Sequence, residues 1–534
     1  YEFYMGDWSS DVCSSDLLTS SLLASCTKDL DRAPFYDVTS ASVYEDFANY
    51  KQVLAKIYAG FATTGQQSPA GNPDVSDIDE GFSNYLRTYW YLQEFTTDEA
   101  VIGWNDATLQ DLHRMNWTAA DAFVKAMYYR IFYQITLCNA FVRETTDDKL
   151  SGRGIDGANA EEARMYRAEA RLLRALSYYH ALDLFGNVPF VTENDPIGSF
   201  YPPQRTRAEI YAYVESELLE LENLLAEPKQ NEYARVDKAA AWTILAKLYL
   251  NSKVYINQDK YTECITYCNK VIGGGYTLSD EYSKLFLADN HTSPEIIFGV
   301  AFDGVKTKTY GGTTFLVHAP VGGSMNPADF GIGGGWSGVR TTKNIVDLFP
   351  DANGDEDKRG EFHSSGQTKE IDDISAFTNG YPIVKWKNVT SGGAIGSDPG
   401  KEFPDTDYPM FRLADVYLMY AEAVERGGGG GTEATALQYV NALRTRAYGD
   451  ATGNITAGQL TLDFLLDERA RELNWEATRR TDLVRFEKFT SGDYLWPWKG
   501  GVKDGRGVET FRNLFPIPAD DVTANPNLEQ NLGY

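Results

Sequence analysis

The strongest constraint on the fold is a helical period between residues 408 and 489. Apolar side chains recur there at the three- and four-residue spacing of a helix with one buried face: Leu413, Val416, Tyr417, Tyr420, Ala421 and Val424. Five glycines at 427–431 end this helix, and a second apolar period returns through Leu437 and Leu443. A third, strongly charged helix is predicted over residues 465–486. A chain with such hairpins must bury several helical faces against one another, which predicts a mainly α fold.

Repeat-like spacing makes this prediction more specific. Residues 242–249 read Trp-x-x-Leu-Ala-x-x-Tyr, the spacing of the first helix of a tetratricopeptide repeat, and residues 413–417 repeat part of it. Cys264 and Cys268 lie one helical turn apart at the packing positions of the partner helix. Since such repeats bury their apolar faces by stacking on each other, we expect a helical scaffold of tetratricopeptide type.

The helical period is lost between residues 294 and 404. Strands are predicted over residues 295–302 and 381–387, among loops rich in glycine and aspartate. Residues 63–117 are also predicted to be rich in loops. Because helices flank it on both sides, we interpret 294–404 as a loop-and-hairpin insertion on a rigid scaffold, where functional surfaces usually lie.

The N-terminal residues carry a targeting signal. Residues 17–25 form a short apolar run before Cys26, and Leu-Ala-Ser-Cys matches a bacterial lipobox. Residues 1–27 contain no lysine or arginine, although a signal peptide begins with basic residues. We therefore interpret 1–16 as non-native, 17–25 as a signal-peptide remnant and Cys26 as a lipidated membrane anchor. The expected division is a leader at 1–25, an N-terminal helical part at 26–290 and a C-terminal part at 291–534.

Charge and motifs exclude several classes of function. The formal net charge of −27 argues against nucleic-acid binding, which needs a basic surface. Residues 333–338 satisfy the pattern G-x-G-x-x-G, but no strand and helix flank them as a dinucleotide site requires. The five histidines are scattered and form no catalytic motif.

Two acidic clusters are weaker candidates. Glu468, Glu472 and Glu476 share one helical face and could be glycosidase carboxylates, but the nearby arginines favour structural ion pairs. A second cluster resembles the start of a calcium loop and is formed by Asp351, Asn353, Asp355 and Asp357. It lacks the glycine and glutamate of an EF-hand, so the alternatives are a solvated acidic turn and a structural calcium site; no other cofactor is expected.

Three segments together resemble the SusD/RagB family of nutrient-binding lipoproteins on the outer membrane of Bacteroidetes. They are FRLADVYLMYAEAVERG at 411–427, LLDERARELNWEATRRTDLVRF at 465–486 and LFPIPADDVTANPNLEQNLGY at 514–534. The resemblance implies a cell-surface lipoprotein that captures oligosaccharides and delivers them to a SusC-like TonB-dependent transporter. The alternatives are capture of another nutrient such as peptides, a glycoside hydrolase, and a helical scaffold for protein partners.

The resemblance also implies a glycan-binding surface. Trp104 follows an acidic segment at 96–99 and is the expected stacking platform, with Asn105 beside it. Asp79 and Arg87 lie where the starch-binding member has polar contacts with sugar. Rings from the insertion would complete an aromatic arc, and the candidates are Tyr310, Phe315 and Trp336.

Overall fold

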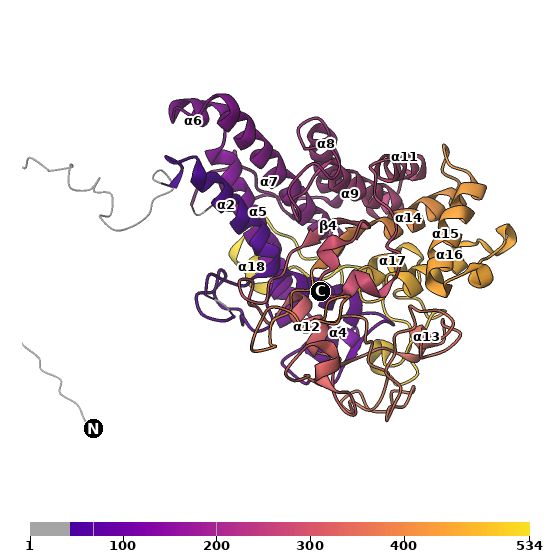
Figure 1. Cartoon of the computed structure of the whole chain (residues 1–534). Helices are drawn as coiled ribbons and strands as arrows, with labels where there is room; N and C mark the ends of the chain where they lie inside the picture. The colour runs from indigo at the N-terminus through magenta and orange to yellow at the C-terminus, as the bar shows by residue number, and fades with distance from the viewer. Residues whose placement is uncertain (1–42, 68, 199) are drawn as a thin grey trace, which may run out of the picture. The chain divides into compact units, whose positions relative to one another are not determined.

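The computed structural model describes residues 43–67, 69–198 and 200–534, and Phe47–Tyr534 form one unit. The predictions of a leader and of lipidation at Cys26 fall outside the described residues. The mainly α fold with a tetratricopeptide-like scaffold is confirmed (Figure 1). None of the described helices is long and apolar enough to cross a membrane.

Helices that follow one another in the chain pack side by side in a continuous stack. The stack consists of α5 (Ala122–Glu144), α7 (Gly157–Leu184), α8 (Arg207–Leu221), α9 (Lys238–Leu250), α11 (Tyr261–Ile272), α14 (Leu413–Glu425), α15 (Glu433–Tyr448) and α16 (Leu462–Glu472). Helix α2 (Ala48–Ala62) packs against α5 and α7 at the start of the stack. Cys264 and Cys268 of α11 are buried, as the repeat spacing predicts.

Local signals in the sequence set the ends of several helices. Thr206 and Glu209 have the T-x-x-E spacing that predicts a capping box, and the structure forms this box at the start of α8. Asp237 precedes the repeat-like helix at 242–249 and is predicted to cap it; in the structure it accepts hydrogen bonds from two backbone N–H groups in the first turn of α9. Helix α14 ends at Glu425, and the glycine run begins after Arg426 with Gly427, which has φ of 88°.

The prediction of one helix over residues 465–486 is wrong. The chain leaves α16 after Glu472 and starts a new helix, α17 (Arg479–Arg485). Trp475 lies between them with φ of 58°, and its backbone N–H donates to a carboxylate oxygen of Glu99 at 2.8 Å. A second distant carboxylate, that of Glu94, accepts from Thr478 N at 3.1 Å. These buried acceptors take the N–H groups that a continuous helix would have used.

The predicted loop-rich segment 63–117 is more ordered than expected. It contains α3 (Tyr85–Trp90), which continues into a π-helical turn (Tyr91–Phe95), then β1 (Val101–Ile102) and α4 (Leu109–His113). Every residue of α3 and of the π-helical turn is buried. Aromatic and leucine side chains therefore hide this segment inside the protein, where the backbone must form its own hydrogen bonds.

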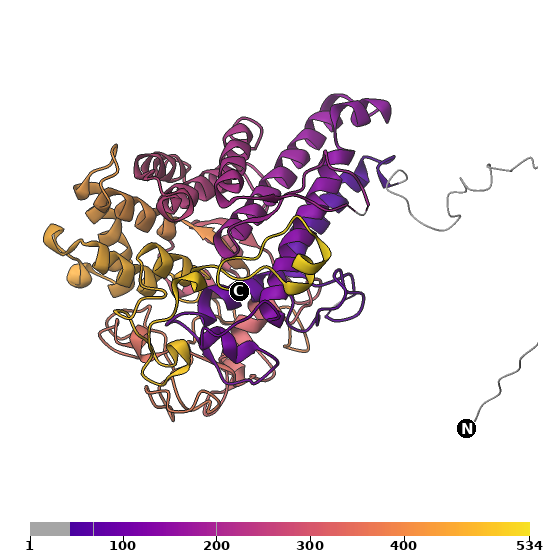
Figure 2. The same cartoon turned by 180° about the vertical axis from the view of Figure 1, so that it is seen from behind.

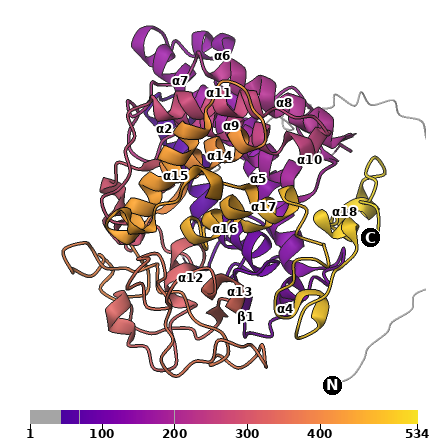
Figure 3. The same cartoon turned by 90° about the vertical axis from the view of Figure 1, so that its right-hand side faces the viewer.

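The insertion contains little regular structure. The strand predicted over 295–302 is present as β4 (Ile296–Val300), which pairs antiparallel with β6 (Tyr408–Arg412). Residues 381–387 do not form the predicted strand, because they make only isolated bridges to Thr341 and Phe362. Two short helices, α12 (Gly312–His318) and α13 (Lys343–Val346), lie near β1 and α4 on one side of α16 (Figure 3).

Buried ion pairs join the insertion to the helical stack. Arg359 of the insertion lies 2.8 Å from Glu468 and 3.0 Å from Glu472 of α16, and all three side chains are fully buried. Lys385 donates to Glu476 at 2.6 Å. Buried charges are costly unless each one is paired, so this arrangement fixes the insertion to the scaffold.

Candidate functional site

A two-stranded sheet brings together two loops that are distant in sequence. Strand β1 pairs antiparallel with β5 (Val339–Arg340), and Val101 lies opposite Arg340. Immediately beyond this ladder, Gly103 N donates to Gly338 O at 2.9 Å. The loop that carries Trp104 is therefore held against the loop that carries Trp336.

The two tryptophans form the centre of an aromatic cluster. Their ring centroids lie 6.2 Å apart, and Trp104 Nε1 donates to the backbone oxygen of Trp336 at 3.2 Å. Tyr310 lies edge-on to Trp336, with 6.5 Å between centroids, and Phe315 of α12 lies edge-on to Trp104 at 6.3 Å. Phe315 is buried, whereas the other three rings are half-buried. We call Trp104, Tyr310 and Trp336 the aromatic arc.

Arg87 lies beside the arc. Its guanidinium carbon is 4.6 Å from the Phe315 ring centroid and about 6 Å from those of Trp104 and Trp336, at 6.0 and 5.9 Å. Nη1 donates to the backbone oxygens of Gly81 and Tyr310 at 2.7 and 2.8 Å. Among the described residues, no carboxylate lies within ion-pair distance of Arg87. This cation is therefore positioned by carbonyls and rings, and its charge is not neutralised by a neighbour.

Two residues outside the arc hold its tryptophans in place. His318 stacks on Trp336 with centroids 4.9 Å apart. Its ring nitrogens Nδ1 and Nε2 lie 2.7 and 2.8 Å from the backbone oxygens of Gly334 and Glu402, which accept the imidazole N–H. Gly338 lies against Trp104, where an added Cβ would come within 2.5 Å of the indole ring. Sequence reasoning missed both roles, because neither the scattered histidine nor a glycine in a glycine-rich loop carried a distinguishing pattern.

Two of the predicted polar residues, Asp79 and Asn105, lie at exposed positions beside the arc. Asp79 is exposed, and its carboxylate accepts from Gly81 N at 2.7 Å, next to the carbonyl that Arg87 binds. Asn105 is exposed directly after Trp104. The structure therefore brings Trp104, Tyr310, Phe315, Trp336 and Arg87 into one cluster, and leaves Asp79 and Asn105 at solvent-facing positions beside it. The segment 333–338 is a loop that leads into β5.

The predicted glutamate stripe lies elsewhere and is engaged in ion pairs. Glu468 and Glu472 belong to α16, whereas Glu476 lies beyond the end of this helix, so the three do not share one helical face. Glu472 is fully buried between arginines, three of which come from other elements: Arg359, Arg412 and Arg446. Burial alone would raise the pKa of Glu472, but these guanidinium groups lower it to about 2. A general acid needs a raised pKa and access to substrate, so the stripe serves stability. Most of the arginines that pair with these glutamates are distant from them in the sequence.

The residues of the calcium candidate are used by the protein itself. Asp351 accepts from the backbone N–H groups of Asn353, Asp355 and Glu356 at 2.8 to 3.0 Å. The Asp357 carboxylate is buried and binds the Arg359 guanidinium through both oxygens. No group of three or more metal-binding side chains comes together within the described residues. Calcium binding stays a prediction, which a calcium titration monitored by thermal unfolding would check.

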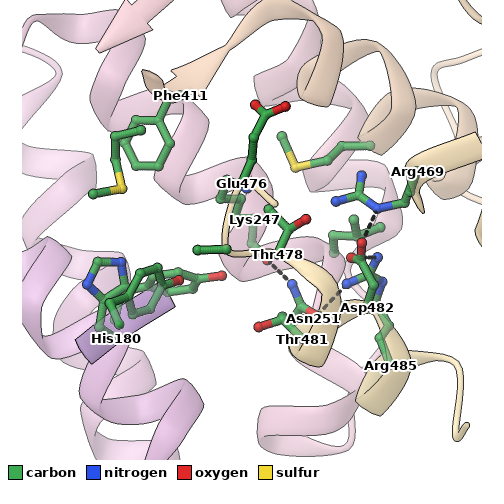
Figure 4. A pocket seen from close by; sticks show the side chains of 16 residues that line it. His180, Lys247, Asn251, Phe411, Arg469, Glu476, Thr478, Thr481, Asp482 and Arg485 are labelled. Carbon is green, nitrogen blue, oxygen red and sulfur yellow. Dashed lines mark hydrogen bonds and ion pairs between the residues drawn. The ribbon is translucent and has the colours of Figure 1, made fainter. Parts of the chain in front are cut away.

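A polar cavity inside the scaffold is too small for a sugar (Figure 4). It has a volume of about 40 Å³ and lies between His180, Lys247 and the start of α17. Its charges are satisfied within the wall, since Asp482 accepts from Arg469 at 2.8 Å and from Arg485 at 2.7 Å. A cavity of this size holds water only, because one water needs roughly 10–15 Å³.

Comparison with known proteins defines the family to which this chain belongs. Residues 372–534 match the model of the SusD family, and residues 34–250 match a family described as starch-binding and associating with the outer membrane. The starch-binding protein SusD of Bacteroides thetaiotaomicron is 36% identical over 96% of this chain and 97% of its own length. The chain therefore belongs to the SusD family.

Solved structures have the same fold. Surface glycan-binding protein A from Bacteroides fluxus aligns with a TM-score of 0.69 at 20% identity, over 91% of this chain and 99% of its own. A laminarin-binding SusD-like protein aligns with a TM-score of 0.68 at 21% identity, over the same shares of the two chains. At these identities the likeness concerns the fold.

Proposed function

We propose that this protein is a cell-surface glycan-binding lipoprotein that captures oligosaccharides and delivers them to a SusC-like TonB-dependent transporter in the outer membrane. The aromatic arc carries the proposal, because its three rings stay half-exposed while side chains and backbone hold them in position. The flat apolar faces of such rings suit the CH-rich faces of pyranoses. The names of relatives support this ligand class, since one binds starch and another binds laminarin.

Polar groups beside the arc fit the hydroxyls of a sugar. Arg87 Nη2 has no hydrogen-bond partner among the described residues, and Asp79 and Asn105 are exposed nearby. Planar guanidinium, carboxylate and amide groups bind neighbouring hydroxyls in pairs, which gives orientation and specificity. The proposed mechanism is binding without bond cleavage, and it agrees with the buried, arginine-paired state of the glutamate stripe.

The test is binding to a panel of plant, microbial and host polysaccharides, with amylopectin included because of the starch-binding relative. Trp336→Ala removes one ring of the arc, and we expect affinity for the bound glycan to fall by about 30-fold or more, as at other interface tryptophans. Leu224→Ala is the control, since Leu224 is 47% exposed in the turn after α8, outside the arc.

The outcome separates the alternatives. Weaker binding or the loss of one binding site in Trp336→Ala, with unchanged binding in the control and unchanged melting of both variants, supports the arc as the site. Full binding in Trp336→Ala would refute it. Binding of peptides, with no polysaccharide bound, would favour capture of peptides as the nutrient. Shortened products from a labelled glycan would favour a glycoside hydrolase.

Delivery to a transporter is supported by the family description, which associates these proteins with the outer membrane. Co-expression with a SusC-like barrel, followed by affinity purification of the tagged lipoprotein, tests it directly. The barrel is expected to co-purify in a fixed ratio. Recovery of the lipoprotein alone in detergents that preserve other outer-membrane complexes would contradict delivery by contact.

A further inference from the structure

A second aromatic groove lies on another part of the surface. It has a volume of about 880 Å³ and runs between α5, the loop after β2 (Val188–Pro189) and the C-terminal segment that contains α18 (Ala519–Ala524). Figure 2 shows this C-terminal segment, in yellow, beside α5. The groove shares no residue with the arc. Six rings line it: Tyr128, Tyr129, Phe132, Tyr133, Phe200 and Tyr201.

The wall of the groove is held in place before any ligand arrives. Asn527 Nδ2 donates to the backbone oxygen of Tyr201 at 2.8 Å, and Asn525 Nδ2 donates to that of Pro202 at 2.9 Å. Although its backbone is fixed, the Tyr201 side chain is 62% exposed. An exposed ring on a fixed backbone loses little conformational freedom when a ligand stacks on it.

Polar atoms in the groove have no partner. Tyr128 is 2% exposed, yet its hydroxyl has no hydrogen-bond partner among the described residues, and the same is true of Asp521 Oδ2 in the opposite wall. Burial, followed by the nearby Asp521 carboxylate, raises the pKa of the Tyr128 hydroxyl well above its usual range, so the hydroxyl stays a neutral donor. Buried polar groups are normally satisfied, so these two atoms point to hydrogen bonds with a ligand.

The charge of the groove selects the class of ligand. Its ionisable side chains are tyrosines and the carboxylates of Asp74 and Asp521, and it contains no cation. Lys56, outside the groove, lies 2.6 Å from Asp74 and neutralises that carboxylate. Asp521 has Asp520 beside it, and Lys125, which lies outside the groove, pairs with Asp520. An anionic ligand would be repelled by these carboxylates, whereas a neutral ligand rich in hydroxyls can donate to Asp521.

We propose that this groove is a second carbohydrate-binding site, which takes a short neutral oligosaccharide stacked on Tyr201 and hydrogen-bonded to Tyr128 and Asp521. The ligand class rests on the proposed function, whereas the groove itself does not. Its volume lies within the usual range of about 300–1,000 Å³ for small-ligand sites.

Helix α5 connects the groove to the surroundings of the arc. Phe123, at the start of α5, packs against Phe82 and Tyr91, with ring centroids 4.6 and 5.6 Å apart, and Tyr91 accepts from Arg87 Nε at 2.7 Å. The groove residues of α5 begin five positions later, roughly 8 Å further along the helix axis at 1.5 Å per residue. Two sites on one rigid scaffold can bind the same long polysaccharide, which increases avidity.

The test is calorimetric titration of the protein with maltoheptaose. We expect two binding sites per chain in the natural sequence. Trp336→Ala should leave one site, that of the groove, and Tyr201→Ala should leave the other, that of the arc. Tyr201→Phe keeps the ring and should retain both sites, while Tyr201→Ala in the Trp336→Ala background should abolish binding.

The titrations distinguish failure of the groove as a binding site from failure of the proposed function of the arc. Binding in Trp336→Ala that is lost on further change of Tyr201 to alanine supports the groove, whatever the arc does. No maltoheptaose bound by Trp336→Ala overturns the inference, even when the arc binds as proposed. Sedimentation velocity would also overturn the inference if the natural protein were a dimer and Tyr201→Ala a monomer. The groove would then bind a second copy of the chain.

Discussion

The buried charge cluster at the junction of insertion and scaffold makes a quantitative prediction about stability. Arg412, the last residue of β6, is 1% exposed and contacts three carboxylates: Glu295 at 2.9 Å, Glu472 at 2.7 Å and Glu476 at 2.6 Å. Arg412→Met keeps most of the side-chain volume but removes the charge. The three carboxylates would then remain buried with one cation fewer, which costs about 3–5 kcal/mol in comparable sites.

The expected shift in melting temperature follows from the size of the unit. Unfolding entropy of about 2.1 cal/mol/K per residue, over the unit Phe47–Tyr534, gives an entropy of about 1 kcal/mol/K. A loss of 3–5 kcal/mol therefore lowers the melting temperature by about 3–5 °C. Lys51→Met is the matched control, because the Lys51–Glu232 pair is exposed and such pairs contribute less than about 1 kcal/mol.

Circular dichroism during heating, together with urea denaturation, measures both variants. The Arg412→Met loss should persist in 1 M salt, since water and ions do not reach a fully buried cluster. A melting temperature within about 1 °C of the natural protein would refute the reasoning, because the remaining cations would then compensate the carboxylates without Arg412.

Three further changes test other parts of the structure. Burial raises the pKa of Glu99 well above its usual range, so the folded state keeps a proton that the unfolded state releases above about pH 4.5. The free energy of unfolding should therefore fall as pH rises from 5 to 8, and urea denaturation should find a smaller fall in Glu99→Gln. Gly338→Ala places a Cβ within 2.5 Å of the Trp104 ring and should weaken glycan binding about tenfold in titration, with little change in melting. Asn84→Ala removes the side-chain acceptor for Gly312 N, at 3.1 Å, and should cost about 1–3 kcal/mol in urea denaturation.

The sequence predicted the parts of the fold that depend on neighbouring residues. The capping box at Thr206 and Glu209, the cap at Asp237 and the glycine stop after α14 are formed as expected, because each depends on groups within a few residues. The break after Glu472 could not be predicted in this way. Its acceptors are Glu94 and Glu99, more than 370 positions away in the chain, and helical period alone favours continuation.

The candidate site could be predicted as a set of residue types but not as a geometry. Trp104 and Trp336 are 232 positions apart, and the pairing of β1 with β5 that joins them involves only two residues on each strand. A strand of two residues has no detectable alternation, so nothing local indicates its partner. The two locations expected from the sequence, the loop after 96–99 and the insertion, consequently form one candidate site.

The ion pairs and the arc are parts of one arrangement. Tyr310 and Trp336 belong to an insertion with little regular structure, and loops of this kind are usually mobile. Here Arg359 ties the insertion to α16, and Lys385 ties it to the segment between α16 and α17, both through buried carboxylates. Strand β5 also ties the insertion to β1 beside Trp104. Rings that are already in position lose less entropy when a glycan binds. Under the proposed function, the buried charges of the scaffold therefore contribute to binding by holding the rings in position, although none of them lies in the aromatic arc.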